Sequence, residues 1–259
     1  MRRTWAVTAG ALVAALFILL PVAGLVVEAP WSAMRESLFT PQVRQALILS
    51  LTCSTLAALI AVALALPLAW VLADPTTPGR GFLQGVCALG LVLPPVVSGI
   101  ALLAAFGPQG LVGKPLDDWF GIQLTFTTAG TVMAQTFVAL PLVVLTLSAA
   151  FRSVDARALD AARSFGARPW LQFRAVVLPA VGPSILAAAI LGWARALGEF
   201  GATITFAGNL PGTTQTLPLA VYELLATDPG ASILVSLLMI AIALVTLILL
   251  RGRWTGVLR

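Results

Sequence analysis

Six long apolar stretches divide this chain, and they constrain its fold more than any other feature. Each is about twenty residues or longer, which is the length a helix needs to cross a hydrocarbon core of about 30 Å. They lie near Trp5–Val27, Ala46–Leu72, Phe82–Phe106, Thr125–Ala150, Ala180–Phe200 and Ala231–Leu250. Hydrophobic residues make up 59% of the chain and charged residues only 10%, which indicates an integral membrane protein. We therefore predict an all-α protein of six transmembrane helices, with residues 1–259 forming a single domain.

The distribution of basic residues predicts the orientation. With the N-terminus placed in the cytoplasm, eleven basic residues fall inside and three, Arg35, Arg44 and Lys114, fall outside. The inner ones are Arg2, Arg3, Arg80, Arg152, Arg157, Arg163, Arg168, Arg174, Arg251, Arg253 and Arg259. Because cytoplasmic loops are enriched in Lys and Arg, both termini and the 152–179 loop are predicted to be cytoplasmic. This asymmetry also explains the pI near 10.6 without a nucleic-acid partner.

The first apolar stretch has two interpretations. Arg2 and Arg3 precede it, as in a signal peptide, but its length of about twenty-three residues exceeds a usual signal core. The Val27–Ala29 segment is also a poor cleavage site. We interpret the stretch as a retained helix, and the rest of the topology is the same in either case.

The basic loop, residues 152–179, is predicted to contain a helix–glycine–helix element. Asp155 suits an N-cap, the residues from Ala156 to Phe165 favour a helix, and Gly166 suits the left-handed position that ends one. Pro169 suits the first turn of a second short helix. An element this short and this charged does not cross the membrane, and a soluble partner can grip it.

Several chemistries are excluded by the residues present. The chain has no histidine, so histidine-based acid–base catalysis and metal ligation are ruled out. Cys53 and Cys87 lie in separate apolar stretches, which is typical of small buried side chains. The Gly107–Lys114 segment resembles a phosphate loop only superficially, because Pro115 occupies the Ser/Thr position that would bind magnesium. We predict no catalytic residue, no metal site and no cofactor on this chain.

One motif in the basic loop carries a family resemblance. Asp160–Gly166 (DAARSFG), followed by Leu178 and Pro179, resembles the "EAA" loop of ABC importer permeases, with Asp160 where the family has Glu. The resemblance implies a type I importer fold in which this loop is a cytoplasmic coupling helix seated in an ATPase. The coupling residues it implies are Asp160, Ala161, Ala162, Gly166, Leu178 and Pro179.

Further segments narrow the resemblance to the oxyanion permeases. Ala194–Thr203 (ARALGEFGAT) is similar to the end of the fifth helix in permeases for sulfate, molybdate and tungstate. Phe206–Tyr222 (FAGNLPGTTQTLPLAVY) resembles the molybdate branch, and so do Leu93–Gly99 and Asp117–Ile122. Tungstate permeases with six spans remain an alternative, as do sulfate or thiosulfate permeases. A stand-alone secondary transporter is a rival from another class, although such proteins more often show internal repeats and an ion relay.

The resemblance also implies the partners and the location. It implies a homodimer of permeases in a bacterial or archaeal inner membrane, two cytoplasmic ATPase subunits that bind ATP and Mg²⁺, and an extracytoplasmic molybdate-binding protein. The other direct partner is the lipid bilayer.

Two places inside the apolar stretches are candidates for the pathway or its gate. Pro94 and Pro95 lack backbone donors and are predicted to kink or open the third span, and Gly99 allows close helix approach. A packing kink and a pathway-lining bend both fit this pattern. The resemblance favours the bend, because it implies that the third and fifth helices border the translocation pathway. In the fifth span, Arg195 and Glu199 share a helix face, about 22 Å along the helix from Ala180. They fit a substrate contact or a structural pair that shapes the outer gate, and we favour the structural pair.

Overall fold

The structure is a computed structural model that describes residues 5–257. The regular elements within these residues are all helices, joined by turns and loops. Arg2, Arg3 and Arg259, used above for the orientation, lie outside the described residues. The α-helices are α1 (Trp5–Glu28), α2 (Met34–Leu38), α3 (Pro41–Ala73), α4 (Arg80–Val92), α5 (Pro95–Phe106), α6 (Gly113–Phe120), α7 (Thr128–Arg152), α8 (Ala156–Ser164), α9 (Pro169–Gln172), α10 (Leu178–Leu197), α11 (Gly201–Phe206), α12 (Leu217–Thr227) and α13 (Pro229–Val257). A 3₁₀ turn, η1 (Trp31–Ala33), precedes α2, and a π-helical turn, η2 (Phe173–Val177), joins α9 to α10.

Five membrane-length helical segments and one broken pair account for the six predicted stretches. The uninterrupted ones are Val7–Glu28, Pro41–Ala73, Thr128–Arg152, Pro169–Leu197 and Pro229–Ile248. The third stretch is not one straight helix, because the chain bends by 118° between α4 and α5. The all-α membrane fold expected from the sequence is confirmed.

The fifth stretch differs from its predicted bounds at both ends. The helix at Pro169 is not a separate short element, because η2 carries it directly into α10. At the other end α10 stops at Leu197, so Glu199 and Phe200 lie in a break before α11. The sequence alone suggested one span from Ala180 to Phe200. The π-helical turn extends the helix at its start, and the glycines at the break end it early. Neither feature changes the hydropathy from which the bounds were predicted.

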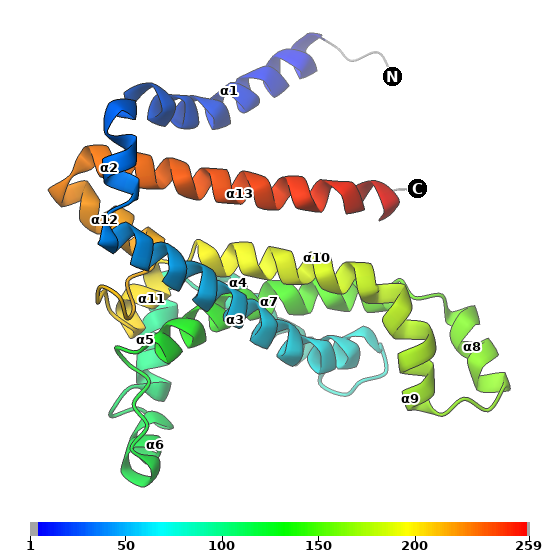
Figure 1. Cartoon of the computed structure of the whole chain (residues 1–259). Coiled ribbons are helices and arrows are strands. Elements are labelled where there is room, and N and C mark those ends of the chain that lie inside the picture. The colour runs from blue at the N-terminus through cyan, green and yellow to red at the C-terminus, as the bar shows by residue number, and fades with distance from the viewer. Residues whose placement is uncertain (1–4, 258–259) are drawn as a thin grey trace.

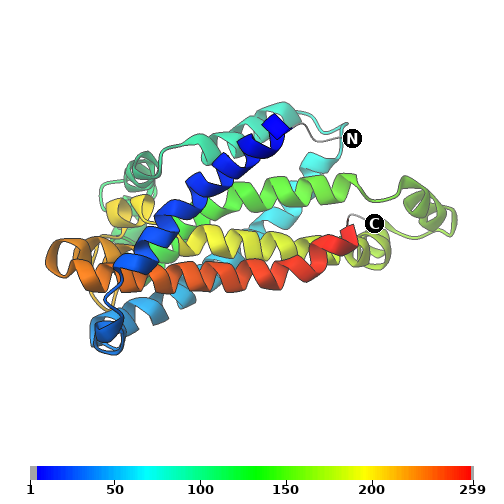
Figure 2. The same cartoon turned by 90° about the horizontal axis from the view of Figure 1, so that it is seen from above.

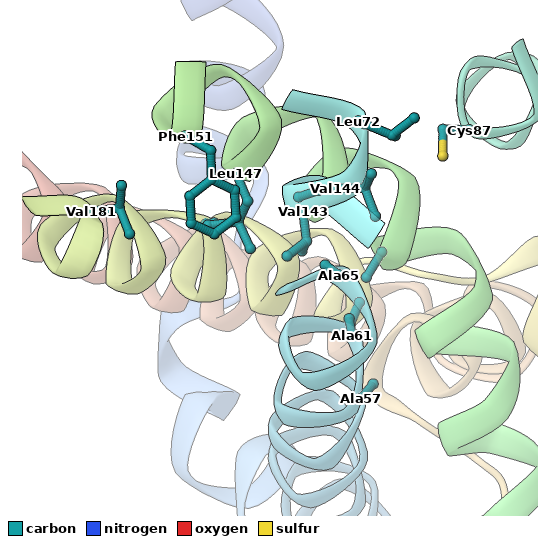
Figure 3. Close-up of a cluster of buried hydrophobic side chains, with 14 of the residues drawn as sticks. Ala57, Ala61, Ala65, Leu72, Cys87, Val143, Val144, Leu147, Phe151 and Val181 are labelled. Carbon is teal, nitrogen blue, oxygen red and sulfur yellow. The ribbon is translucent and has the colours of Figure 1, made fainter. Parts of the chain in front are cut away.

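The centre of the bundle is formed by α3, α7 and α10. In the second half of α3, every fourth residue is a fully buried alanine, and these alanines face valines, leucines and Phe151 of α7 together with α10 (Figure 3). The α3 alanines are Ala57, Ala61, Ala65 and Ala69. Because lipid is as apolar as a helix surface, small residues that allow close contact stabilise helix pairs in a membrane. This packing holds the three helices as a common frame.

The elements separate into two ends of the molecule. The start of α1, the end of α13 and the helices α8 and α9 lie at one end, while α2, α6, α11 and α12 lie at the other (Figures 1 and 2). Helices α7, α10 and α13 run between these ends in both views. Helix α1 leans away from the bundle (Figure 1), and none of its membrane-length window is buried.

Candidate functional site

The first element of the candidate site is the break between α4 and α5. Leu93 and Pro94 both adopt extended ψ angles, 127° and 138°. Each precedes a proline, and the proline ring disfavours the helical conformation in the residue before it. Two prolines in succession therefore impose two extended residues, which turn the chain and allow Pro95 to start α5. The predicted kink at Pro94 and Pro95 is confirmed, and it is a complete break.

The second element is the break between α10 and α11. Helix α10 ends at Leu197, and Gly198 closes it through backbone hydrogen bonds to Ala194 and Ala196. Phe200 then leaves the helical conformation, with φ −123°, and α11 begins at Gly201. The chain is thus interrupted inside the fifth apolar stretch, at the motif that resembles the oxyanion permeases.

The structure brings the two breaks into contact. A Cβ atom added to Gly201 would lie 2.7 Å from Pro95 Cβ. One added to Gly99 would lie 2.5 Å from Thr205 Cβ and 3.0 Å from the carbonyl oxygen of Ala202. Real Cβ contacts are not this short, so glycine is required at both positions. Pro95 and Gly99, predicted from one stretch, therefore pack against the break in another.

Arg195 and Glu199 are paired beside this contact. Arg195 Nη1 donates to Glu199 Oε2 at 2.8 Å, and Glu199 Oε1 accepts the backbone N–H of Ala202 at 2.8 Å. The Glu199 side chain is only 1% exposed, whereas that of Arg195 is 37% exposed. The predicted pair is confirmed as a contact. Each carboxylate oxygen of Glu199 thus accepts one hydrogen bond, and together the two bonds link Arg195 to the start of α11.

Two buried polar side chains lie close to the breaks. Gln135 of α7 and Thr203 of α11 are fully buried, and neither side chain has a hydrogen-bond partner among the described residues. Their chain neighbours Ala134 and Ala202 belong to one packed cluster. Buried polar groups are nearly always hydrogen-bonded, so these two side chains are exceptions in an otherwise apolar part of the bundle. Sequence reasoning did not single out either side chain. Gln135 is a single polar residue in an apolar stretch, and Thr203 entered only as the last residue of the Ala194–Thr203 motif.

The first helix and the glycine of the helix–glycine–helix element form as predicted at the opposite end of the bundle, whereas the second helix continues into α10. Asp155 caps α8 by accepting the backbone N–H of Arg157 at 2.9 Å. Gly166 ends the turn with φ +74°, and no atom lies within 4 Å of the position of a Cβ on it. Backbone conformation, not space, therefore requires glycine here.

The predicted coupling residues fall into two groups. Asp160, Ala161 and Ala162 lie on α8, where Asp160 forms an exposed ion pair with Arg163 at 3.1 Å. Leu178 and Pro179 lie apart from them, in the first turn of α10. Next to Gly166, Phe165 is 91% exposed, so the turn that follows α8 presents an apolar residue that the described chain does not cover.

Aromatic side chains connect this element to the bundle. Trp70, at the end of α3, makes edge-to-face contacts with Phe151 of α7 and Phe173 of η2, at centroid distances of 5.4 and 5.5 Å. Trp170 of α9 stacks on Phe173 at 6.0 Å. These contacts join α9 and η2 to the ends of α3 and α7 at this end of the bundle. No residue pattern in the sequence pointed to this cluster.

At the end of the bundle opposite α8, one carboxylate accepts hydrogen bonds from three amide side chains. Glu223 of α12 accepts hydrogen bonds from Gln42 at 3.2 Å and Asn209 at 3.1 Å, and another from Gln215. Gln42 also donates to Gln215 at 3.1 Å. This network fastens the segment after α11 to α12 and to the start of α3. Sequence reasoning missed it because Gln42 and Glu223 are 181 positions apart.

The described residues contain no group of three or more His, Cys, Asp or Glu side chains able to hold a metal ion. Cys53 and Cys87 are buried free thiols. The arrangement is that of an apolar bundle with two contacting helix breaks inside and a helical element exposed at one end.

Comparison with known proteins identifies the family. Residues 65–252 match the family described as binding-protein-dependent transport system inner membrane component. The chain belongs to this family. It is thus a multi-pass inner membrane protein, and the resemblance drawn from its motifs is confirmed.

Relatives within the family match most of the chain. The molybdenum transport system permease protein of Escherichia coli K12 is 43% identical over 210 residues, covering 81% of this chain and 92% of the relative. The protein of the same name from Mycobacterium tuberculosis H37Rv is 41% identical over 227 residues, covering 88% and 86%.

A solved structure supports the fold of this family member. A chain of a bacterial ABC transporter involved in the import of the acidic polysaccharide alginate superposes with a TM-score of 0.75 at 19% identity, covering 98% of this chain and 96% of that one. At this identity the likeness concerns the fold alone. The type I importer fold implied by the motif in the basic loop is confirmed.

Proposed function

We propose that this chain is the membrane-spanning permease subunit of an ATP-driven importer for molybdate. The observation that carries the proposal is the 41–43% identity to molybdenum permeases over more than four fifths of the chain. The contacting breaks supply a movable region inside the bundle, and α8 supplies an exposed contact for an ATPase. Tungstate and sulfate share the tetrahedral geometry of molybdate and are the competing substrates.

The assembly we propose has two copies of this chain, two cytoplasmic ATPase subunits and one extracytoplasmic binding protein. ATP and Mg²⁺ bind to the ATPase, and this chain has neither a catalytic site nor a cofactor. A second copy is supported by Arg195, whose 37% exposure within a membrane span calls for a protein or water neighbour. Both termini and α8 lie in the cytoplasm in this proposal.

In operation, ATP binding to the ATPase moves α8 and, through Phe173, the inner ends of α3, α7 and α10. The motion reaches the outer half of the bundle along α10, which ends at the paired breaks. Pro94, Pro95 and Gly99 on one side, and Arg195 and Glu199 on the other, then form the gate. Glycine at positions 99 and 201 lets the two breaks slide past each other at short range.

The test is uptake by proteoliposomes that contain the permease, the ATPase and the binding protein. We expect molybdate uptake that requires ATP, and competition by unlabelled tungstate that exceeds competition by sulfate. The purified chain alone is expected neither to bind nor to hydrolyse ATP, because it lacks a phosphate loop. Uptake by the chain alone, driven by an ion gradient, would support a secondary transporter instead.

A further inference from the structure

Arg195 lies near the middle of the membrane-spanning bundle. Gly192, one turn earlier on α10, packs against Val143 of α7, since a Cβ on Gly192 would lie 2.6 Å from Val143 Cγ2. Val143 is fifteen positions from the start of α7 and nine from its end. At 1.5 Å per residue, Val143 is about 22 Å from the start of α7 and about 14 Å from its end. Helix α10 runs in the opposite direction to α7 (Figure 1), so Arg195, three residues beyond Gly192, is about 18 Å from either end of α7. A cation at that depth cannot reach the headgroups at either surface.

Only some of the N–H donors of the Arg195 guanidinium form hydrogen bonds within the described chain. The guanidinium carries five N–H donors, and the hydrogen bond within the described chain is the one from Nη1 to Glu199. Glu199 itself is used on both oxygens, by Arg195 and by the N–H of Ala202. The carboxylate is therefore an internal anchor, whereas the guanidinium has free donors on the side where it is 37% exposed.

Lipid is an unsuitable cover for those free donors. A charged side chain in the hydrocarbon centre is costly, and such groups face protein or a water-filled space. In the homodimer proposed above, we place this face on the space between the two permease chains. This step rests on the proposed function, because it takes the homodimer and its central pathway as given.

We propose that Arg195 contacts the tetrahedral oxyanion as it passes through the bundle, and that Glu199 keeps the contact weak. A guanidinium offers paired N–H donors that match two oxygens of a tetrahedral oxyanion. Transport requires an interaction favourable enough for entry and weak enough for release. Glu199, 2.8 Å from Nη1, offsets part of the positive charge and so limits the retention of a dianion.

The position of the pair couples this contact to the helix break. Glu199 is bonded to Ala202, and Gly201, next to Ala202, contacts Pro95. A displacement of one break against the other therefore moves the carboxylate relative to Arg195 and changes the charge that the oxyanion meets. Glu199 is a positioning residue in this scheme, and Arg195 is the residue that touches the substrate.

The experiment uses the complete complex in proteoliposomes, with variants R195Q, R195K, E199Q and the double variant R195Q/E199Q. Each is measured for uptake of radiolabelled oxyanion, for ATP hydrolysis stimulated by the loaded binding protein, and for the mass of the assembled complex. A fourth measurement is the oxyanion retained on the complex after rapid filtration. The oxyanion is the one that the wild type carries, out of molybdate, tungstate and sulfate.

We expect R195Q to import about ten- to one-hundred-fold more slowly, the range for the loss of one charge-assisted hydrogen bond, with assembly and stimulated ATP hydrolysis retained. R195K is expected to fall between R195Q and the wild type. E199Q keeps the acceptor for Ala202 and is expected to retain more oxyanion while importing it more slowly. Increased retention in E199Q is a signature that a purely structural pair does not produce.

Three outcomes would overturn the role of Arg195. Wild-type uptake by R195Q/E199Q, which replaces the ion pair by a neutral hydrogen bond, would show that only the structural pairing matters. Loss of the second permease copy in R195Q would show that the free donors serve the interface between copies. Wild-type uptake by R195Q would show that the arginine is dispensable. If the wild type imports none of the three oxyanions, the proposed function itself fails.

Discussion

At the scale of single residues, the glycines divide into two kinds with different physical roles. Gly166 adopts φ +74° in open space, so its requirement is conformational. Gly99 and Gly201 have ordinary backbone angles, and their requirement is space, since an added Cβ would clash with Thr205 or Pro95. The first kind shapes the exposed element that we propose as the ATPase contact, and the second kind brings two helix breaks together.

Substitution of Gly166 tests the first kind. A β-branched residue in the left-handed conformation costs about 1–2 kcal/mol, so Gly166→Val should change the turn after α8. We expect the variant to insert in the membrane while less ATPase co-purifies and less ATP hydrolysis is stimulated by the loaded binding protein. Ala161→Glu, which enlarges a small residue of α8, is expected to act in the same way.

The matched control is Gly182→Ala in α10, where glycine has an ordinary φ and no atom lies within 4 Å of the added Cβ. This control should assemble and couple like the wild type. Wild-type coupling in both Gly166→Val and Ala161→Glu would remove α8 from the transmission path.

At the scale of elements, the broken spans matter more than the straight ones. Helices α4 and α5 are interrupted by consecutive prolines, whereas α10 and α11 are interrupted by Gly198 and by the Glu199 side chain that bonds to Ala202. Helix α5 packs against α11 through Gly99 and Thr205. Each break lacks the continuous backbone hydrogen bonds of a straight helix, and we propose that this pair of short helices is the part of the bundle that opens.

The contact between the breaks can be tested by adding one methyl group. Gly201→Ala places a Cβ 2.7 Å from Pro95 Cβ, and overpacking of this kind costs about 1–3 kcal/mol. We expect a lower midpoint of thermal unfolding in detergent and reduced uptake. Gly85→Ala in α4, where the added Cβ has no neighbour within 4 Å, should leave both unchanged. Equal behaviour of the two variants would show that the breaks can separate without cost.

At the scale of the whole molecule, charge and architecture agree on two distinct ends. Helices α8 and α9 lie at the end where α13 finishes (Figure 1), and arginines concentrate there in the sequence. The other end contains the Glu223 network and the exposed aromatic residues Trp119 and Phe120 of α6. The aromatic cluster at Trp70 lies at the end of α3, and α3, α7 and α10 pack together as one core between the two ends.

The orientation of these ends can be measured by thiol labelling. Ser153→Cys, in a background in which Cys53 and Cys87 are replaced by alanine, should resist a membrane-impermeant thiol reagent in intact cells. Ser32→Cys, in the exposed turn η1 at the opposite end, is the matched control and should be labelled. Labelling of Ser153→Cys, with protection of Ser32→Cys, would invert the topology and place α8 on the wrong side for an ATPase.

Local stereochemistry determined most of what the sequence could predict. Hydropathy located the six stretches, Asp155 and Gly166 bounded α8, the Pro94–Pro95 pair broke the third stretch, and the four-residue spacing paired Arg195 with Glu199. Each of these depends on neighbours within a few positions, so the residue pattern is sufficient. The motif in the 160–166 segment is equally local, and it indicated the family from its residue types and spacing alone.

The tertiary structure alone decided which distant residues meet. Gly201 against Pro95, Trp70 against Phe173, and Gln42 against Glu223 involve residues 103 to 181 positions apart. In a soluble protein the apolar face of a helix indicates what it packs against. In this bundle lipid-facing and protein-facing sides are equally apolar, so hydropathy does not specify helix neighbours. Which side of Arg195 stays open was therefore decided by the packing of α10 against α7 and α3, where small residues set the distances.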